Sequence, residues 1–245
     1  ADVTISDADN TAIAGTVLSA IGSETTGTVT ASNSIEVTGT ISEVTAALVT
    51  SGSKIVAGGA STAATVSDLA TVSEGDTLAQ VTNVQAGFTN GISDSAGNLA
   101  SSGSISSGLT NIKNDDSNVA ITISDADNTA ITAADLSAIG AATSGTVSAT
   151  NAIEVTGNST QITAALITSG SKISAASSST AATVSDQVSV STAESIASVT
   201  NIIADFTNGI SDVIANLASS GTITSELTTV KNDDSNVAIT ISDAD

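Results

Sequence analysis

The feature that most constrains this chain is a gapless internal repeat of 118 residues. The segment ISDADNTAI at 5–13 returns at 123–131, and 75 of the 118 aligned positions are identical. The chain therefore divides into repeat 1 (1–118), repeat 2 (119–236) and the start of a third repeat (237–245). Self-similarity over a long fixed period is typical of stacked architectures, in which each repeat buries its apolar face against a neighbour.

The sequence stops inside a motif, because VAITISDAD at 119–127 is also the sequence at 237–245. This pattern indicates either an excerpt of a longer array or a subunit whose end meets the beginning of the next subunit. No distinct polar cap is visible at either end. We therefore expect a homo-oligomer that assembles head to tail.

Within each repeat, short β-branched segments alternate with Ala, Leu, Val and Ile at helical spacing. The expected strands are 120–124 and 146–157 in repeat 2, and 62–68 and 91–94 in repeat 1. Three helices are expected from their capping residues. The first begins at Thr132 and Asp135, and the second begins at Asn158 and Gln161, which correspond to Thr40 and Glu43 in repeat 1. The third begins at Ser73 and Asp76, which correspond to Ser191 and Glu194 in repeat 2, and it is expected to bury Leu78 and Val81. Helical turns are expected from Asp94 to Gly103 and around Leu109 and Ile112, followed by a polar corner at 113–118.

Regular alternation of strand and helix predicts parallel strands with right-handed crossovers. The predicted fold class is α/β, as a repetitive solenoid of strand-helix coils with a parallel sheet and about four coils per 118-residue repeat. Phe88 and Phe206, the two aromatic residues, are expected to fill the core. Disorder and an ordinary doubly wound domain are the alternative interpretations.

The composition excludes several functions. The chain lacks His and Cys, so it cannot form the usual zinc, haem or iron-sulfur sites, a thiol nucleophile or a Ser/His/Asp triad. A net charge of −21 with four lysines disfavours binding to nucleic acid or to an anionic membrane surface. No apolar run is long enough to insert into a bilayer. Without a phosphate-binding loop or aromatic sugar platforms, we expect no enzyme activity and no small-molecule substrate.

Oxygen ligands are the only metal-binding groups that remain, and they favour Ca²⁺ as the cofactor. Clustered Asp and Asn residues at two corners of each repeat are the candidate metal ligands: Asp7, Asp9, Asn10, Asp115, Asp116, Asn118, Asp125, Asp127, Asn128, Asp233, Asp234 and Asn236. These corners match neither the EF-hand loop nor the glycine-rich calcium nonapeptide, and solvated turns are the competing interpretation.

A hydrophobic-Ser-Asp motif occurs three times per repeat. It ends at Asp7, Asp68 and Asp94 in repeat 1, and at Asp125, Asp186 and Asp212 in repeat 2. Strand ends stacked in register would form a carboxylate ladder that binds calcium. The alternative is that each Asp caps or turns the chain after its strand.

Two motif pairs carry a resemblance to known proteins: IEVTG followed by TAAL, and ISD followed by NLASSG. They resemble the tandem repeats of very large secreted surface proteins of marine bacteria, especially cyanobacteria, and the resemblance covers all 245 residues. It implies export without a cleaved signal peptide, an extracellular or cell-surface location, and a role in surface layers, adhesion or filaments, often with calcium.

The sequence therefore predicts an extracellular structural repeat protein that forms a rod, filament or surface coat by end-to-end stacking. The alternative is the calcium-stiffened spacer of a secreted adhesin whose ligand-binding domain lies outside this segment.

Overall fold

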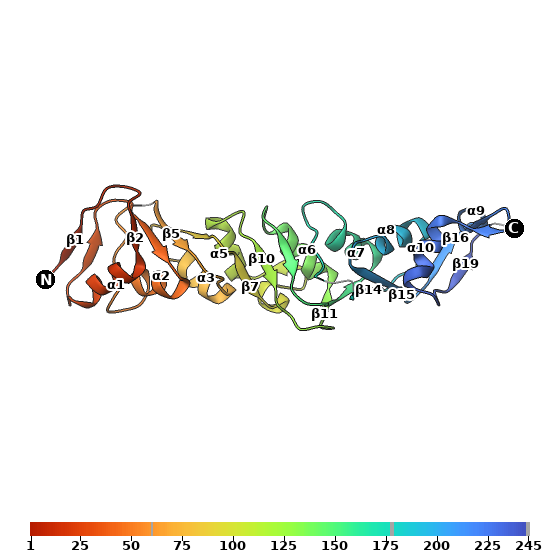
Figure 1. Cartoon of the computed structure of the whole chain (residues 1–245), viewed down its shortest axis with the longest axis horizontal. Helices are drawn as coiled ribbons and strands as arrows, with labels where there is room; N and C mark the ends of the chain where they lie inside the picture. The colour runs from red at the N-terminus through yellow and green to blue at the C-terminus, as the bar shows by residue number, and fades with distance from the viewer. Residues whose placement is uncertain (60, 177–178, 244–245) are drawn as a thin grey trace. The chain divides into compact units, whose positions relative to one another are not determined.

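The computed structural model describes residues 1–59, 61–176 and 179–243, and it alternates short β-strands with α-helices along the chain (Figure 1). The strands of its larger sheets run parallel, so the fold is α/β as the sequence predicts. The last two residues of the predicted third repeat, 244–245, lie outside the described residues.

The chain divides into two compact units that are interleaved in the sequence. Unit 1 consists of Ala1–Asp94, Ser106–Thr122 and Ala142–Thr146, and unit 2 consists of Ser95–Ile105, Ile123–Ala141 and Val147–Asp245. The units do not coincide with the two sequence repeats, because each takes its segments from both.

Unit 1 has seven strands and four helices among its described residues, and β10 (Ile121–Ile123) lies at the unit boundary. The strands are β1 (Val3–Ile5), β2 (Ala12–Ala14), β3 (Val29–Ala31), β4 (Glu36–Gly39), β5 (Thr62–Val66), β6 (Val84–Phe88) and β7 (Ile92–Asp94). The helices are α1 (Gly15–Ser23), α2 (Ile41–Leu48), α3 (Val72–Ala79) and α5 (Ser107–Asp115).

Unit 2 repeats most of this order. Its strands are β8 (Ala100–Ser101), β9 (Ser104–Ile105), β11 (Ala130–Thr132), β12 (Val147–Ala149), β13 (Glu154–Gly157), β14 (Thr180–Val184), β15 (Ile202–Phe206), β16 (Ile210–Asp212), β17 (Ala218–Ser219), β18 (Thr222–Ile223) and β19 (Ile239–Ile241). Its helices are α4 (Ala96–Leu99), α6 (Ala133–Ala141), α7 (Ser159–Leu166), α8 (Val190–Ala197), α9 (Ile214–Leu217) and α10 (Ser225–Asp233).

The main sheet of each unit contains four parallel strands, in the order β2-β4-β5-β6 in unit 1 and β11-β13-β14-β15 in unit 2. Alternate residues of β5 and β14 are buried, as expected for strands with one face against a core. Neighbouring helices pack beside one another, α1 beside α2 and α6 beside α7, and α2 and α7 also contact the sheet strands. Helices α2 and α7 therefore cover the strands next to them in the sequence.

The predicted helix starts at Thr40 and Asn158 are confirmed. Both residues form capping boxes, with Glu43 and Gln161 as the reciprocal partners. The cap predicted from Ser73 and Asp76 is wrong by two residues. Helix α3 begins after Thr71, which forms a capping box with Glu74.

The equivalent helix of repeat 2, α8, is capped by Ser189, which contradicts the prediction from Ser191 and Glu194. Leu78 is buried as predicted, whereas Val81 is half-buried because it follows the end of α3.

Two other predictions need correction. The expected strand 146–157 is two strands, β12 and β13, because Asn151 turns the chain and donates a side-chain hydrogen bond to the Asp125 carbonyl oxygen. The turn expected around Leu109 and Ile112 is the nine-residue helix α5, which includes the beginning of the predicted corner 113–118. Strand β6 and the antiparallel hairpin of β8 and β9 were not predicted. Phe88 and Phe206 are 4% and 2% exposed, which confirms their place in the core.

Candidate functional site

The Asp residues of the hydrophobic-Ser-Asp motifs cap helices that precede them in the sequence. In six cases a carboxylate oxygen accepts a hydrogen bond from the backbone N–H of the first residue of a helix, at 2.6 to 3.1 Å. The pairs are Asp68 with Ile41, Asp94 with Val72, Asp125 with Ala96, Asp186 with Ser159, Asp212 with Val190, and Asp243 with Ile214. The first N–H groups of a helix have no acceptor within the helix, and a carboxylate is a strong one. Each of these six motifs therefore ties one strand-helix segment to the next.

Asp7 is the exception. Its side chain is exposed, and its carboxylate accepts no hydrogen bond from the described residues. Its carbonyl oxygen accepts a bond from the Asn33 side chain at 2.6 Å. The equivalent residue Asp125 makes both kinds of bond, because its carbonyl oxygen accepts from Asn151 at 2.7 Å.

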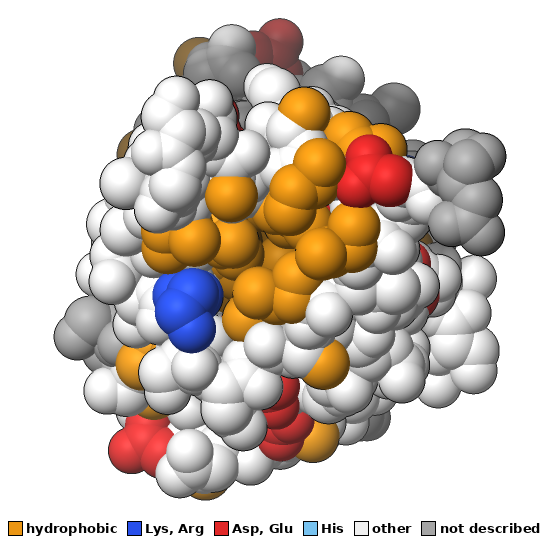
Figure 2. Space-filling view, turned by 90° about the vertical axis from the view of Figure 1, so that its right-hand side faces the viewer, with side chains coloured by type: hydrophobic (Ala, Val, Ile, Leu, Met, Phe, Trp, Pro, Cys, Tyr) orange, Lys and Arg blue, Asp and Glu red, His pale blue; other side chains and the backbone are white. Residues whose placement is uncertain are grey.

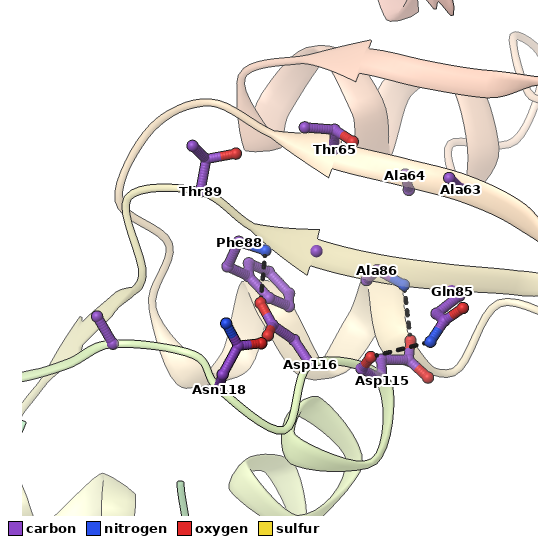
Figure 3. Close-up of a pocket in the computed structure, with 12 residues that line it drawn as sticks. Ala63, Ala64, Thr65, Gln85, Ala86, Phe88, Thr89, Asp115, Asp116 and Asn118 are labelled. Carbon is purple, nitrogen blue, oxygen red and sulfur yellow. Dashed lines mark hydrogen bonds between the residues drawn. The ribbon is translucent and has the colours of Figure 1, made fainter. Parts of the chain in front are cut away.

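Asp115 and Asp116 satisfy the open edge of strand β6 in unit 1. Their carboxylates accept hydrogen bonds from the backbone N–H groups of Ala86 and Phe88, both at 2.9 Å (Figure 3). These N–H groups belong to the last strand of the four-stranded sheet. Unpaired edge groups promote pairing with other chains. The two carboxylates therefore supply the hydrogen-bond acceptors that a neighbouring strand would otherwise provide.

The same arrangement occurs in unit 2, where Asp233 and Asp234 accept from the N–H groups of Ala204 and Phe206 at 3.1 Å. Among the twelve predicted metal ligands, Asp234 is the one that is buried. Asn118 and Asn236 are exposed at these corners, and the backbone N–H of Asn236 donates to Asp234.

The corners at Asp9 and Asp127 are also hydrogen-bonded turns. Asp9 accepts from the backbone N–H of Ser34, and Asp127 accepts from that of Ala152, both at 2.8 Å. The next residues, Asn10 and Asn128, have positive φ angles of 61° and 59°. Asn adopts this left-handed conformation more readily than most residues.

Seven of the eight Asp residues proposed to bind calcium thus accept hydrogen bonds from backbone N–H groups, and Asp7 is the exception. Among residues 1–59, 61–176 and 179–243, no group of three or more Asp or Glu side chains is placed to hold a metal ion. A cleft of about 480 Å³ beside β6 contains Asp115, Asp116 and Asn118 (Figure 3), but both carboxylates face backbone N–H groups there. Burial raises the pKa of the Asp115 carboxyl above its ordinary value, the bond from Ala86 lowers it, and the Asp116 charge raises it. Calcium binding at these corners stays a prediction.

A contact that the sequence did not reveal joins α6 to the β8-β9 hairpin in unit 2. Asp135 Oδ1 accepts a hydrogen bond from the Gly103 N–H at 2.7 Å, and the same side chain bonds the hydroxyl of Thr132. The capping-box pattern correctly predicted the start of α6 at Thr132 and Asp135. It could not show that one carboxylate oxygen also holds a hairpin 32 residues earlier.

Among the described residues, no helix makes at the equivalent hairpin of β17 and β18 the contacts that α6 makes at the β8-β9 hairpin. Hydrophobic side chains gather in the middle of the face that contains the C-terminal segment, with charged side chains at the edges (Figure 2). The exposed large apolar residues of segment 213–241, which we call the C-terminal apolar face, are Val213, Ile214, Ile223, Ile239 and Ile241. Apolar surface of this kind is typical of an interaction site.

The burial of equivalent positions differs sharply. Ile239 and Ile241 are 43% and 58% exposed, whereas Ile121 and Ile123 are 1% and 0% exposed. The residues occupy the same repeat positions and have the same side chains. The difference therefore comes from what covers them.

Comparisons with protein-family models, curated proteins and solved structures find nothing that matches this chain. Within the described ranges, the helices are all too short or too polar to span a bilayer.

Proposed function

We propose that this chain is a non-catalytic structural protein, an α/β solenoid whose repeats stack end to end into an extracellular rod, filament or surface coat. The C-terminal apolar face is the observation that carries the proposal. Ile214, Ile239 and Ile241 of this face occupy the same repeat positions as Ala96, Ile121 and Ile123, which are buried inside the chain. Stacked repeats bury such faces against each other, and this is how solenoids gain stability.

Two further observations support the solenoid. The strands of each main sheet pair in chain order, β2 with β4 and β4 with β5: Ala12 lies opposite Glu36, which lies opposite Ala63. The Asp caps connect successive strand-helix segments in the same direction along the chain. Both patterns are local and repetitive, so they can continue through any number of repeats.

The cell-surface location rests on the resemblance to secreted bacterial repeat proteins and on the acidic charge, which keeps such a surface soluble. In the alternative, the same repeats form the calcium-stiffened spacer of a secreted adhesin. The two proposals differ in whether the repeats themselves associate, so association is the property to measure.

The test is sedimentation velocity over a wide concentration range, followed by electron microscopy of the 245-residue chain. We expect concentration-dependent growth into linear species. Ile214→Asp, which places a charge in the C-terminal apolar face, should abolish this growth. Leu69→Asp is the matched control, because Leu69 is 54% exposed but lies outside that face. Monomers at all concentrations, or equal loss in both variants, would contradict the proposal.

A further inference from the structure

Each unit contains a cleft at the C-terminal ends of two neighbouring helices, with a lysine in its wall. In unit 1 the cleft has a volume of about 330 Å³ at the ends of α2 and α3, and we call it the Lys54 cleft. In unit 2 the cleft has a volume of about 500 Å³ at the ends of α7 and α8, and we call it the Lys172 cleft. The first is lined by residues 48–49, 54–57, 77 and 80–82, and the second by residues 166–167, 172–175, 195 and 198–201.

The two clefts are equivalent in sequence position. Each of the ten residues that line the Lys54 cleft has a counterpart 118 positions later that lines the Lys172 cleft. In the first cleft, Val49 and Val81 are half-buried in apolar walls, and Thr77 is exposed at the rim. The cleft is therefore a feature of the repeat, which forms it twice from the same positions.

The ammonium groups in these clefts have no counter-ion. The chain has four lysines and 25 acidic residues, yet no Asp or Glu is among the described residues that line either cleft. Within the described segments, Lys54 and Lys172 have neither an ion pair nor a side-chain hydrogen bond. Glu194 accepts a bond from Ser198 at the rim of the Lys172 cleft, but it does not pair with the lysine. Each cleft thus presents one uncompensated positive charge.

The helix ends beside the clefts offset this charge only in part. Carbonyl groups at a helix C-terminus carry partial negative charge when they lack donors. At the end of α2, the Ser53 hydroxyl donates to the Ala46 carbonyl oxygen at 2.8 Å, and the Ile55 N–H donates to that of Ala47 at 2.7 Å. The equivalent bonds in α7 run from Ser171 and Ile173 to Ala164 and Ala165, at 2.7 and 2.8 Å. Because these carbonyl groups have donors, the ammonium is the main charge at each cleft.

We propose that the Lys54 cleft and the Lys172 cleft each bind one small aliphatic carboxylate, with its carboxylate on the lysine and its tail on the apolar walls. A cleft of this size with apolar walls and a few polar groups is typical of a small-molecule site. A ligand with a single negative charge fits best, because a net charge of −21 repels anions more strongly the more charges they carry. The ligand is bound without reaction, and its binding does not depend on the proposed end-to-end stacking.

One substitution between the repeats makes the two clefts unequal. Val56 in the wall of the Lys54 cleft is 47% exposed, and its counterpart in the Lys172 cleft is Ser174. An aliphatic tail gains from contact with the valine but not from contact with the serine hydroxyl. Burial of about one additional methylene group corresponds to about fourfold tighter binding in the Lys54 cleft.

The test is calorimetric titration of sodium octanoate into the 245-residue chain, at low ionic strength and at a concentration at which sedimentation shows monomers. We expect two sites per chain. Lys54→Gln and Lys172→Gln should each leave one site, and the double variant should lose at least about tenfold in affinity, because the charge-assisted hydrogen bond is lost. Of the single variants, Lys172→Gln should bind about fourfold more tightly, since it retains the Lys54 cleft.

Lys113→Gln/Lys231→Gln is the matched control, because it removes the same charge outside both clefts and should keep two sites. Octanamide, which has the same tail without the charge, should bind at least about tenfold more weakly than octanoate. Thermal unfolding of each variant shows whether its fold is intact. No octanoate binding by the natural chain, or unchanged binding by the double cleft variant, would overturn the proposal. Equal losses in the control pair, equal binding of octanamide, or tighter binding by Lys54→Gln than by Lys172→Gln would also overturn it.

Discussion

The β8-β9 hairpin and the β17-β18 hairpin have nearly the same sequence but different surroundings. Ala100 at the first hairpin is 2% exposed, and α6 packs on that hairpin. At the second hairpin Ile223 is 48% exposed, and the nearby Ile214 is 47% exposed. The same local structure forms in both places, so the hairpin does not need its cover in order to fold. Packing of a helix such as α6 on the hairpin determines how much apolar surface is buried.

One repeat is therefore a complete unit of sequence, but it does not bury all of its own apolar residues. Helices and strands are specified by local signals such as capping boxes, which both repeats contain. The core between successive segments is completed by residues that belong to the following segment. Mutations at equivalent positions should therefore have unequal effects wherever the cover differs.

The largest difference in the change of unfolding free energy is expected between Ile123→Ala and Ile241→Ala. Ile123 is fully buried, so the loss of its side chain should lower the free energy of unfolding by about 2–5 kcal/mol. Ile241 is 58% exposed, and its replacement should change stability by less than about 0.5 kcal/mol. Urea unfolding at a concentration that keeps the chain monomeric measures both values. Equal losses would show that the burial difference does not govern stability.

A smaller difference in the change of unfolding free energy is expected between Asp125→Ala and Asp7→Ala. Asp125 caps the first N–H of α4, so its loss should cost about 1 kcal/mol. The Asp7 carboxylate has no donor among the described residues, and its loss should change stability by less than about 0.5 kcal/mol in the monomer. Both can be measured by urea unfolding under the same conditions. A large effect at Asp7 would indicate a partner that the monomer does not contain.

The sequence predicted the features that depend on neighbouring residues. The parallel α/β alternation, the caps at Thr40 and Asn158 and the buried aromatic residues all follow from spacing within about a dozen positions. The role of Asp115 and Asp116 could not be predicted in this way, because their partners Ala86 and Phe88 lie 29 and 28 residues away. Asp and Asn clusters are typical both of calcium loops and of backbone caps. The two roles are distinguished only by where these residues lie relative to the open edge of β6, which the local sequence does not show.

The smallest effect is expected from removal of metal ions, which tests whether calcium stabilises the corners of both repeats. The carboxylates of Asp115, Asp116, Asp233 and Asp234 already accept backbone hydrogen bonds, so we expect a chelator to leave Tm unchanged. A calcium site with free calcium at 100 times its Kd would add about 2.7 kcal/mol, and its loss would lower Tm by several degrees. Thermal unfolding with excess calcium and with excess chelator measures the difference. A fall in Tm with chelator that Asp115→Asn and Asp233→Asn abolish would support the calcium-stiffened spacer, and would show that metal binding contributes to stability alongside packing.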